Sequence, residues 1–222
     1  MVTVSSTFKS SMLNPIAFDE EYDRELLEGS FQALRHHQQL EIVDDEEEYQ
    51  RALRIITDGL TVPDYATLSI QNLFRYVFPN GKFYIAQCLF DFGYPTSSNR
   101  GASYDRKYYF HIAGFAELKV DLGNTFMRSE TKTDKIVGRF FGNDIDFDGT
   151  AKFNDKYYLV SDKKETLESC FDRQFFNTIA KYDNLMLRVK QKQLYITFDT
   201  DFHVGHSRIV EDVLTNCNFL AS

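Results

Sequence analysis

The sequence predicts an α+β fold: a mainly antiparallel sheet with an acidic helical hairpin at the N-terminus and two helices toward the C-terminus. Three observations lead to this prediction. Twenty-one Phe and thirteen Tyr with no Trp suit the half-buried surfaces of a pleated sheet. Residues 107–122, KYYFHIAGFAELKVDL, alternate with the period of two that a strand requires. Residues 19–39 instead consist largely of strong helix formers.

Length and composition set the broad organisation. A chain of 222 residues with 43% hydrophobic content can bury a core without disulfides or a metal. We expect an N-terminal arm and helical hairpin in residues 1–60, packed on an α+β domain in residues 61–222. Cys88, Cys170 and Cys217 are widely spaced and never form C-x-x-C, which favours a reducing, cytoplasmic setting. No stretch approaches the roughly 18 apolar residues that cross a bilayer, so we expect a soluble chain.

Two helices are predicted before residue 61. The first runs from Asp19 to about Gln39 because apolar residues recur near helical spacing. The second begins after Asp44 or Asp45, either of which can cap it, and Gly59 suits its C-terminal end. These helices would form the antiparallel hairpin.

A third helix is predicted over residues 63–77, where apolar side chains fall at i, i+4, i+7, i+8 and i+11. The alternative is a strand leading into a hairpin turn at Asn80-Gly81, since this dipeptide is typical of hairpins.

The remaining elements are mostly strands. Lys82–Phe92 predicts a strand, Pro95–Asp105 a loop, and residues 107–122 a strand that continues past Gly114. Ile136–Phe147 predicts a further strand. The C-terminal part then predicts, in order, a strand over 157–160, a helix from 163 to about 179, a hairpin over 185–198 and a helix over 207–219.

The net charge is unevenly distributed. Residues 19–48 hold twelve acidic and two basic residues, so this segment carries −10 in a chain whose total is −8. A polyanion would be repelled, which disfavours nucleic-acid binding. Glu46, Glu47 and Glu48 are the surface we expect to meet another protein with a basic surface. The alternative is that they form an ordinary solvated helical face.

A calcium-loop pattern occurs in GNDIDFDGTAKFND, residues 142–155. Asp144, Asp146 and Asp148 alternate before Gly149, and hard oxygens beside a glycine turn suit calcium. The flanking segments look like strands, however, whereas an EF-hand requires helices. A hairpin turn at Asp148-Gly149 is therefore the preferred interpretation, and calcium bound by these aspartates is the alternative.

A second polar cluster lies in DTDFHVGHSR, residues 199–208. Asp199, Asp201, His203 and His206 could contribute to a zinc or iron site. Gly205 breaks any regular ligand spacing, so a polar loop that precedes a helix is preferred.

Residues 146–198, DFDGTAKFNDKYYLVSDKKETLESCFDRQFFNTIAKYDNLMLRVKQKQLYITF, carry a resemblance that extends over 107–198. The features are Asp146, Phe153, an aromatic strand ending at Asp162, a helix from Lys163, and the closing Leu194-Tyr195-Ile196. This order resembles a bacterial family of uncharacterised domains often attached to membrane-spanning segments. The resemblance implies a soluble relative and a fold, but no activity.

The sequence lacks the motifs of the common enzyme classes. It holds no G-x-S-x-G elbow, phosphate-binding glycine loop, H-E-x-x-H or dinucleotide fingerprint, and no catalytic residue is predicted. We therefore expect a non-enzymatic accessory or protein-interaction domain of a bacterial cytoplasm, without a cofactor. The alternatives are a calcium-binding protein and a module whose aromatic residues line a cavity for an apolar ligand.

Overall fold

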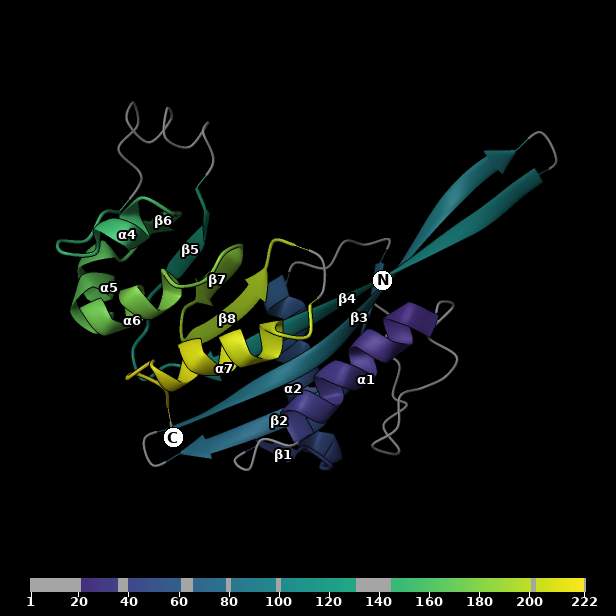
Figure 1. The fold of residues 1–222 in the computed structure, drawn as a ribbon, viewed down its shortest axis with the longest axis horizontal. Coiled ribbons are helices and arrows are strands. Elements are labelled where there is room, and N and C mark those ends of the chain that lie inside the picture. Colours follow the sequence, from purple (N-terminus) through teal and green to yellow (C-terminus); the bar gives the residue numbers. More distant parts are fainter. Residues whose placement is uncertain are drawn as a thin grey trace.

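One antiparallel sheet organises the molecule (Figure 1). The computed structural model describes residues 21–35, 40–60, 66–78, 81–98, 101–130, 145–200 and 203–221. The strands in these ranges form an eight-stranded sheet in the order β1-β2-β3-β4-β8-β7-β5-β6. All of its neighbouring strands pair antiparallel. The predicted α+β class with a mainly antiparallel sheet is thus confirmed.

The elements have the following bounds. The strands are β1 (Leu40–Ile42), β2 (Ala66–Phe78), β3 (Gly81–Ser98), β4 (Gly101–Glu117), β5 (Asn124–Ser129), β6 (Tyr157–Ser161), β7 (Leu185–Lys190) and β8 (Gln193–Phe198). The helices are α1 (Glu21–Arg35), α2 (Glu46–Leu60), α4 (Ala151–Asn154), α5 (Lys164–Cys170), α6 (Arg173–Ile179) and α7 (His206–Thr215). In the described ranges no helix is long and apolar enough to cross a membrane.

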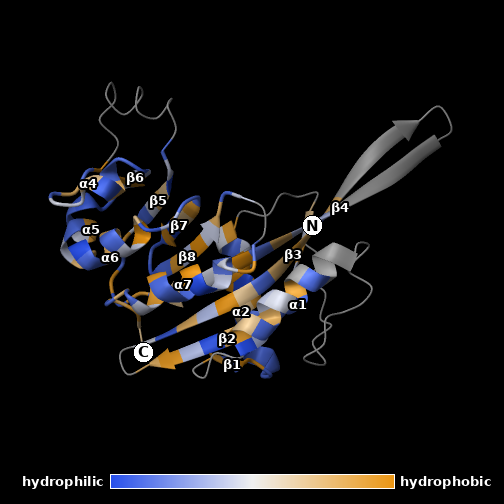
Figure 2. Ribbon diagram, viewed as in Figure 1, coloured by the Kyte–Doolittle hydropathy of each residue, from blue (hydrophilic) through white to orange (hydrophobic). Residues whose placement is uncertain are grey.

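Helices cover both faces of the sheet. Phe31 and Leu34 of α1 share one core cluster with α7 and with β2, β3 and β4, whereas the buried side chains of α2 belong to a second cluster. Figure 1 accordingly shows α7 and α2 on opposite sides of the strands. The helices carry hydrophobic and hydrophilic residues together (Figure 2), as amphipathic elements do. Both clusters contain residues from the first 60 positions, so the described parts of that segment pack on the sheet.

The two N-terminal helices form where the sequence predicts them, but the structure does not confirm their pairing as a hairpin. Strand β1 lies between them and pairs with β2. Phe31 and Leu34 of α1 enter one core cluster, whereas Leu53 and Ile56 of α2 enter the other. Each apolar stripe is therefore buried against the sheet.

Helix α2 begins and ends in ways that sequence only partly predicts. The Glu48 backbone N–H donates to Oδ1 of Asp45 at 2.7 Å, which confirms Asp45 as the cap. Gly59 lies inside the helix, not after its end. Close packing requires glycine there, because a Cβ would lie 2.1 Å from the Tyr195 ring. The last carbonyls accept from Arg188 and Lys190, cations that suit a helix C-terminus.

The helix predicted over residues 63–77 is wrong: residues 66–78 form β2. The alternative of a strand before Asn80-Gly81 is the correct one, since Phe78 pairs with Gly81. Two causes explain the error. Both faces of β2 are buried against helices, and a register shift between Ile70 and Asn72 interrupts the period of two. The resulting apolar spacing imitates a helical stripe.

The loop predicted over Pro95–Asp105 is also wrong. Strands β3 and β4 continue through it, with pairing as far as Ser98 and Gly101, and form a two-stranded ribbon that projects from the sheet (Figure 1). β2 begins opposite Phe92, so Pro95 lies beyond the last residue of β3 that pairs with β2. Such an edge position accepts a proline, whose missing N–H would break the ladder of a central strand.

β4 is the predicted central strand, but it ends at Glu117, earlier than expected. Leu118 then makes an isolated bridge with Leu220, and Val120 is exposed. Gly114 allows α7 to approach the sheet, because a Cβ on it would lie 2.2 Å from Cγ1 of Val210. Glycine is thus required at this position by packing.

The C-terminal predictions hold with two corrections. β6 and the β7–β8 hairpin form at the predicted places, and Gln191 adopts a φ of 58° in the hairpin turn. Helix α7 begins where it was predicted but ends at Thr215, short of the predicted residue 219. The single helix predicted from residue 163 is two helices, α5 and α6. Asp172 separates them and caps α6, since its Oδ1 accepts from the Phe175 backbone N–H at 2.8 Å.

Candidate interaction groove

A groove of about 610 Å³ runs along α2, on the face of the sheet that this helix covers. One wall is α2, and the floor comes from β3, β4, β8 and the last described residues. We call it the α2 groove. Its lining residues are Asp45, Glu46, Glu47, Glu48, Gln50, Arg51, Ala52, Arg54, Ile55, Lys82, Tyr84, Phe115, Glu117, Gln193 and Ala221. All three glutamates predicted to meet a partner are among them.

The three glutamates do not have the same role. Glu48 is the half-buried member: one carboxylate oxygen accepts from the Tyr84 hydroxyl at 2.5 Å and the other from Nη1 of Arg75 at 2.7 Å. Arg75 also donates to Glu41 at 2.9 Å. Both oxygens of Glu48 are therefore occupied, and this side chain holds α2 to the sheet.

Glu46 and Glu47 are exposed on the rim of the groove. Glu46 accepts from Nε2 of Gln50, one turn further along α2, at 2.9 Å. An exposed bond of this kind is easily exchanged for another donor. Glu46 and Glu47 are thus the exposed members of the predicted trio.

Tyr84 and Phe115 form the aromatic floor. They face each other across β3 and β4, and their rings stack with centroids 4.8 Å apart and planes at 9°. Burial raises the pKa of the Tyr84 hydroxyl, and the carboxylate of Glu48 raises it further. Tyr84 therefore remains protonated and donates to Glu48 throughout the neutral range.

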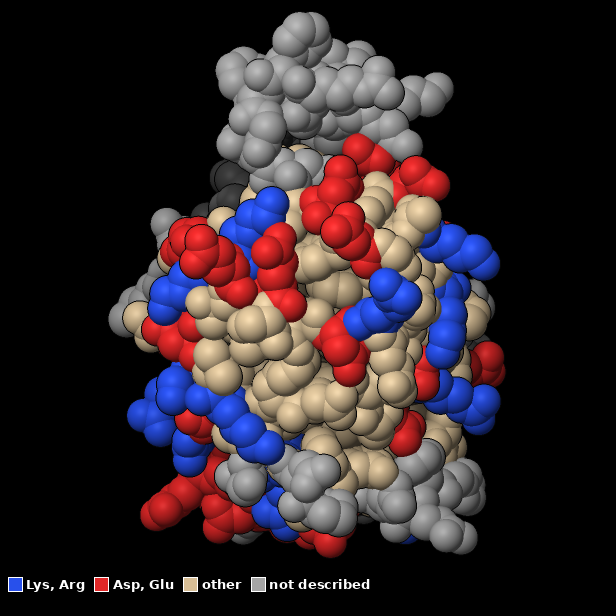
Figure 3. Space-filling view, turned by 90° about the vertical axis from the view of Figure 1, so that its left-hand side faces the viewer, with Lys and Arg blue, Asp and Glu red and all other residues tan. Residues whose placement is uncertain are grey.

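Basic side chains also line the groove. Arg51 lies 3.8 Å from Glu117, an exposed pair that crosses from wall to floor. Arg54 donates to the Gln50 carbonyl of its own helix at 3.3 Å, and Lys82 lies on the floor. The groove thus has acidic residues gathered at the start of α2 and cations elsewhere along its lining. By contrast, the end of the molecule around α4–α6 shows acidic and basic side chains interspersed (Figure 3).

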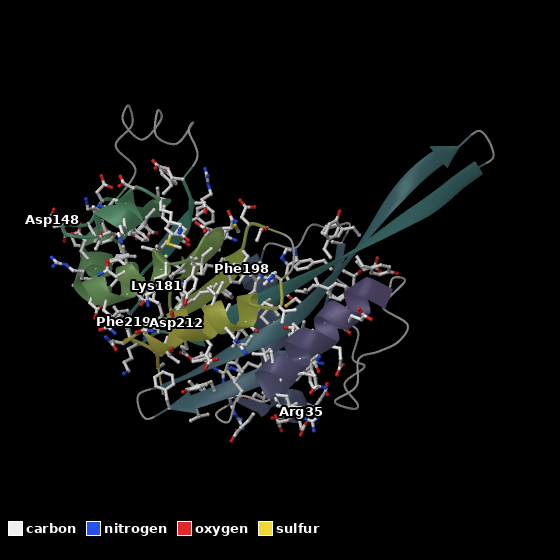
Figure 4. The ribbon with its side chains drawn as sticks, in the orientation of Figure 1. Arg35, Asp148, Lys181, Phe198, Asp212 and Phe219 are labelled. Atoms are coloured by element: carbon white, nitrogen blue, oxygen red, sulfur yellow. The ribbon has the colours of Figure 1, made fainter. Side chains whose placement is uncertain are left out.

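The aspartate loop has a different architecture from the one predicted. Asp144 lies outside the described residues; Asp146 and Asp148 are exposed, and Figure 4 places Asp148 at the outer margin of the molecule. Gly149 has a φ of 76°, as a turn requires, but α4 follows it where a returning hairpin strand was predicted. In the described ranges no three His, Cys, Asp or Glu residues are grouped to hold a metal. Calcium binding stays a prediction.

An asparagine explains this local fold. The Asn154 side chain accepts from the Phe147 N–H at 3.2 Å and donates to the Phe147 carbonyl at 2.9 Å. This pair of bonds folds the loop back on α4 and brings Phe147 onto Phe176, with ring centroids 4.1 Å apart. Asp146 and Asp148 are exposed, while Phe147 between them packs against the core.

The histidine loop is also folded on itself. The Gly205 N–H donates to Nδ1 of His203 at 3.0 Å, and the His203 N–H donates to Nδ1 of His206 at 3.3 Å. His206 is 8% exposed and stacks on Phe198 with centroids 3.8 Å apart. Both imidazoles therefore organise the start of α7. Asp201 lies outside the described residues.

His206 should make folding pH-dependent. Its pKa is lowered from 6.5 to about 4, mainly by burial and in addition by nearby His203 and His111. Below about pH 6.5 His206 is protonated in the unfolded chain but stays neutral in the folded chain. The free energy of unfolding therefore falls as the pH drops from 6.5 toward 4. We expect a loss of about 2 kcal/mol from His206 between roughly pH 7 and pH 5.

Urea denaturation at both pH values measures this loss, with His206→Asn as the control. Asparagine offers an acceptor near the place of Nδ1 and does not titrate, so it should remove most of the slope. An unchanged slope in His206→Asn would show that other groups cause the pH dependence.

The comparisons with known proteins add no relative. The chain matches no protein-family model, no curated protein and no solved structure. The resemblance to a bacterial family of uncharacterised domains stays a prediction.

Sequence reasoning located the rim of the groove but missed its floor. Tyr84 and Phe115 come from β3 and β4, and no local motif joins them. The only signal was that both fall in segments correctly predicted as aromatic strands. Their meeting depends on the register of β3 with β4, which a single sequence does not reveal.

Proposed function

We propose that this chain is a non-enzymatic protein-interaction domain that binds a basic segment of a partner protein in the α2 groove. The observation that carries the proposal is the position of Glu46 and Glu47. Both are exposed at the mouth of a groove whose floor is a fixed pair of aromatic rings. Protein interfaces combine charged rims with aromatic centres in the same way.

The charge balance of the groove supports a basic partner. Of the acidic lining residues, Glu48 is held by Arg75, and Glu117 lies beside Arg51. The remaining acidic residues, Asp45, Glu46 and Glu47, are consecutive at the start of α2. The remaining cations, Arg54 and Lys82, come from two different elements, α2 and β3. A partner whose cations approach the start of α2 gains attraction both at long range and on contact.

The composition of the groove supports a binding role over catalysis. Its described lining contains no His, Cys or Ser, the side chains that most often act as base or nucleophile. The pair closest to an acid–base arrangement, Tyr84 and Glu48, is engaged in holding α2 to the sheet. The proposal includes an accessory role in a bacterial cytoplasm, as the sequence analysis expected.

The test is a charge reversal that leaves the structural glutamate in place. Partners recovered by native pull-down from the source cell, identified by mass spectrometry, are titrated against wild type and Glu46→Lys/Glu47→Lys. We expect about 5- to 30-fold weaker binding at low ionic strength and a smaller difference at high ionic strength.

The matched control is Glu25→Lys/Glu28→Lys, which makes the same charge change on exposed residues of α1. Helix α1 packs on the other core cluster, away from the groove. The proposal would be contradicted if a partner bound the Glu46→Lys/Glu47→Lys variant as tightly as it bound the Glu25→Lys/Glu28→Lys variant.

A further inference from the structure

We propose that the basic segment received by the α2 groove is the β3–β4 ribbon of a second copy of this chain, in a dimer whose two copies exchange ribbons. The ribbon is defined as Gly93–Ser98 of β3 and Gly101–Lys107 of β4. This inference rests on the proposed function, because it names the partner of the α2 groove. It follows from the isolation of the ribbon, from its charge, and from its distance to its own groove.

The ribbon has no neighbouring strand on either side within the described ranges. β2 begins opposite Phe92, and β8 pairs with β4 only from Gly114 onward. The two strands of the ribbon pair with each other and project from the sheet (Figure 1). A two-stranded ribbon is only marginally stable in water unless another surface packs against it. We therefore infer that a second molecule supplies that surface.

The ribbon is a basic part of an acidic chain. Residues 93–107 contain the cations Arg100, Arg106 and Lys107 and a single acidic residue, Asp105. Three positive charges and one negative charge leave +2, whereas the whole chain carries −8. The acidic start of α2 is therefore electrostatically complementary to the ribbon.

The other cationic hairpin of the sheet already contacts α2 within its own chain. Arg188 and Lys190 of β7 donate to the carbonyls of Gly59 and Asp58, at 3.0 and 3.1 Å. These cations serve the C-terminal end of α2, where the helix dipole attracts them. The projecting ribbon is thus the better donor for the acidic start of a neighbouring α2.

The ribbon leads away from the groove of its own chain. Lys82 and Tyr84 of the groove lie near the start of β3, whereas the ribbon begins at Gly93. At roughly 3.3 Å per residue, the strand from Tyr84 to Gly93 spans about 30 Å, and the ribbon continues beyond it. A ribbon that fills the groove must therefore come from a different copy.

The positions of the ribbon and the groove suit a reciprocal dimer. They lie toward opposite ends of the β3–β4 pair, so two copies placed antiparallel each bring a ribbon to the groove of the other. One twofold rotation satisfies both contacts, and closed twofold dimers are the commonest soluble oligomers. The groove, of about 610 Å³, accepts side chains of the ribbon while the ribbon backbone lies along its mouth.

The experiment measures the mass of the full chain in solution by sedimentation velocity at low ionic strength. We expect a species of twice the mass of one chain. Two charge reversals, Glu46→Lys/Glu47→Lys in the groove and Arg106→Glu/Lys107→Glu in the ribbon, should each weaken the dimer about 5- to 30-fold. Added salt should weaken the wild-type dimer as well, because it screens the attraction.

A charge swap makes the test specific. Each reversal alone places like charges across the contact, whereas the two together restore opposite charges. The variant that carries all four changes should therefore recover most of the dimer affinity. The matched control combines Arg106→Glu/Lys107→Glu with Glu25→Lys/Glu28→Lys on α1, which gives the same net charge and should not restore the dimer.

A shortened chain tests the ribbon without reversing any charge in the groove. Tyr94 pairs with Asp105, so replacing Pro95–Tyr104 with Asn-Gly closes a two-residue hairpin at that pair. The shortened chain should be monomeric under conditions in which the wild type is a dimer. Thermal unfolding checks that it is folded, and the charge swap provides the test if it is not.

The outcomes distinguish this inference from the function on which it rests. A monomeric wild type whose recovered protein partner is lost in Glu46→Lys/Glu47→Lys would overturn ribbon exchange and leave the groove to another basic segment. A dimer that survives removal of the ribbon, or that the charge swap does not restore, would also overturn the exchange. A monomer whose partners all tolerate the groove reversal would overturn both proposals.

Discussion

Replacing Phe153 with alanine is expected to lower the free energy of unfolding by about 3–5 kcal/mol. Phe153 is fully buried, and its ring lies between those of Tyr157 and Phe176, with centroids 5.5 and 4.6 Å away. Phe147 contacts it from the aspartate loop at 6.3 Å. Truncation would leave a cavity that none of these fixed rings can fill, so the cost of the cavity adds to the lost apolar transfer energy.

Urea denaturation followed by near-ultraviolet circular dichroism measures this loss, because the aromatic cluster supplies the signal. Lys152→Ala is the matched control, since Lys152 precedes Phe153 on α4 and is exposed. It should change stability by less than about 0.5 kcal/mol. A loss for Phe153→Ala as small as that of the control would show that the cluster around α4 does not pack as described.

Replacing Gly114 with alanine is expected to cost about 2–3 kcal/mol through overpacking. The added Cβ would lie 2.2 Å from Cγ1 of Val210 and 3.1 Å from Cδ1 of Leu214, both fully buried on α7. Glycine weakens the interior of a strand, so backbone preference alone would predict that Gly114→Ala stabilises β4. A measured loss would therefore identify close packing of α7 as the cause.

A double-mutant cycle makes this test specific. Val210→Ala alone should destabilise by leaving a small cavity, but it removes the methyl group that meets the new Cβ. The double variant Gly114→Ala/Val210→Ala should be less destabilised than the two single changes added together. Strict additivity in the cycle would mean that Gly114 and Val210 are not in contact.

The sequence predicted best those elements whose apolar pattern is decided by one packed face. Helix α2 has one buried apolar stripe, formed by Tyr49, Ala52, Leu53 and Ile56. Both this stripe and the Asp45 cap are evident in the sequence. The β7–β8 hairpin shows alternation and a short polar turn. In each case local spacing and burial agree, so the pattern is unambiguous.

Prediction failed where packing acts on both faces of a strand, and where two strands continue beyond their pairing with the rest of the sheet. β2 is buried on two sides and carries a register shift, so its apolar residues fall at helical intervals. The outer ribbon of β3 and β4 pairs only with itself among the described residues beyond Phe92, so polar and turn-forming residues are tolerated there. Strand pairing of this kind leaves no apolar period to detect.

The candidate site was also predicted only in part from the sequence. Glu46 and Glu47 were chosen from charge density alone, and they do lie on the rim of a groove. Glu48 looks identical in the sequence, yet Tyr84 and Arg75 occupy its carboxylate. Only the burial of one helical face distinguishes a structural glutamate from two exposed ones.

The sequence by itself determined the α+β class, the acidic start of α2 and the positions of most elements, because these depend on composition and on spacing within one segment. The tertiary structure alone decided which helix covers which face, that Tyr84 meets Phe115, and that the aspartates around Phe147 turn outward. Those facts depend on strand order and register, which are fixed by contacts between segments far apart in the chain.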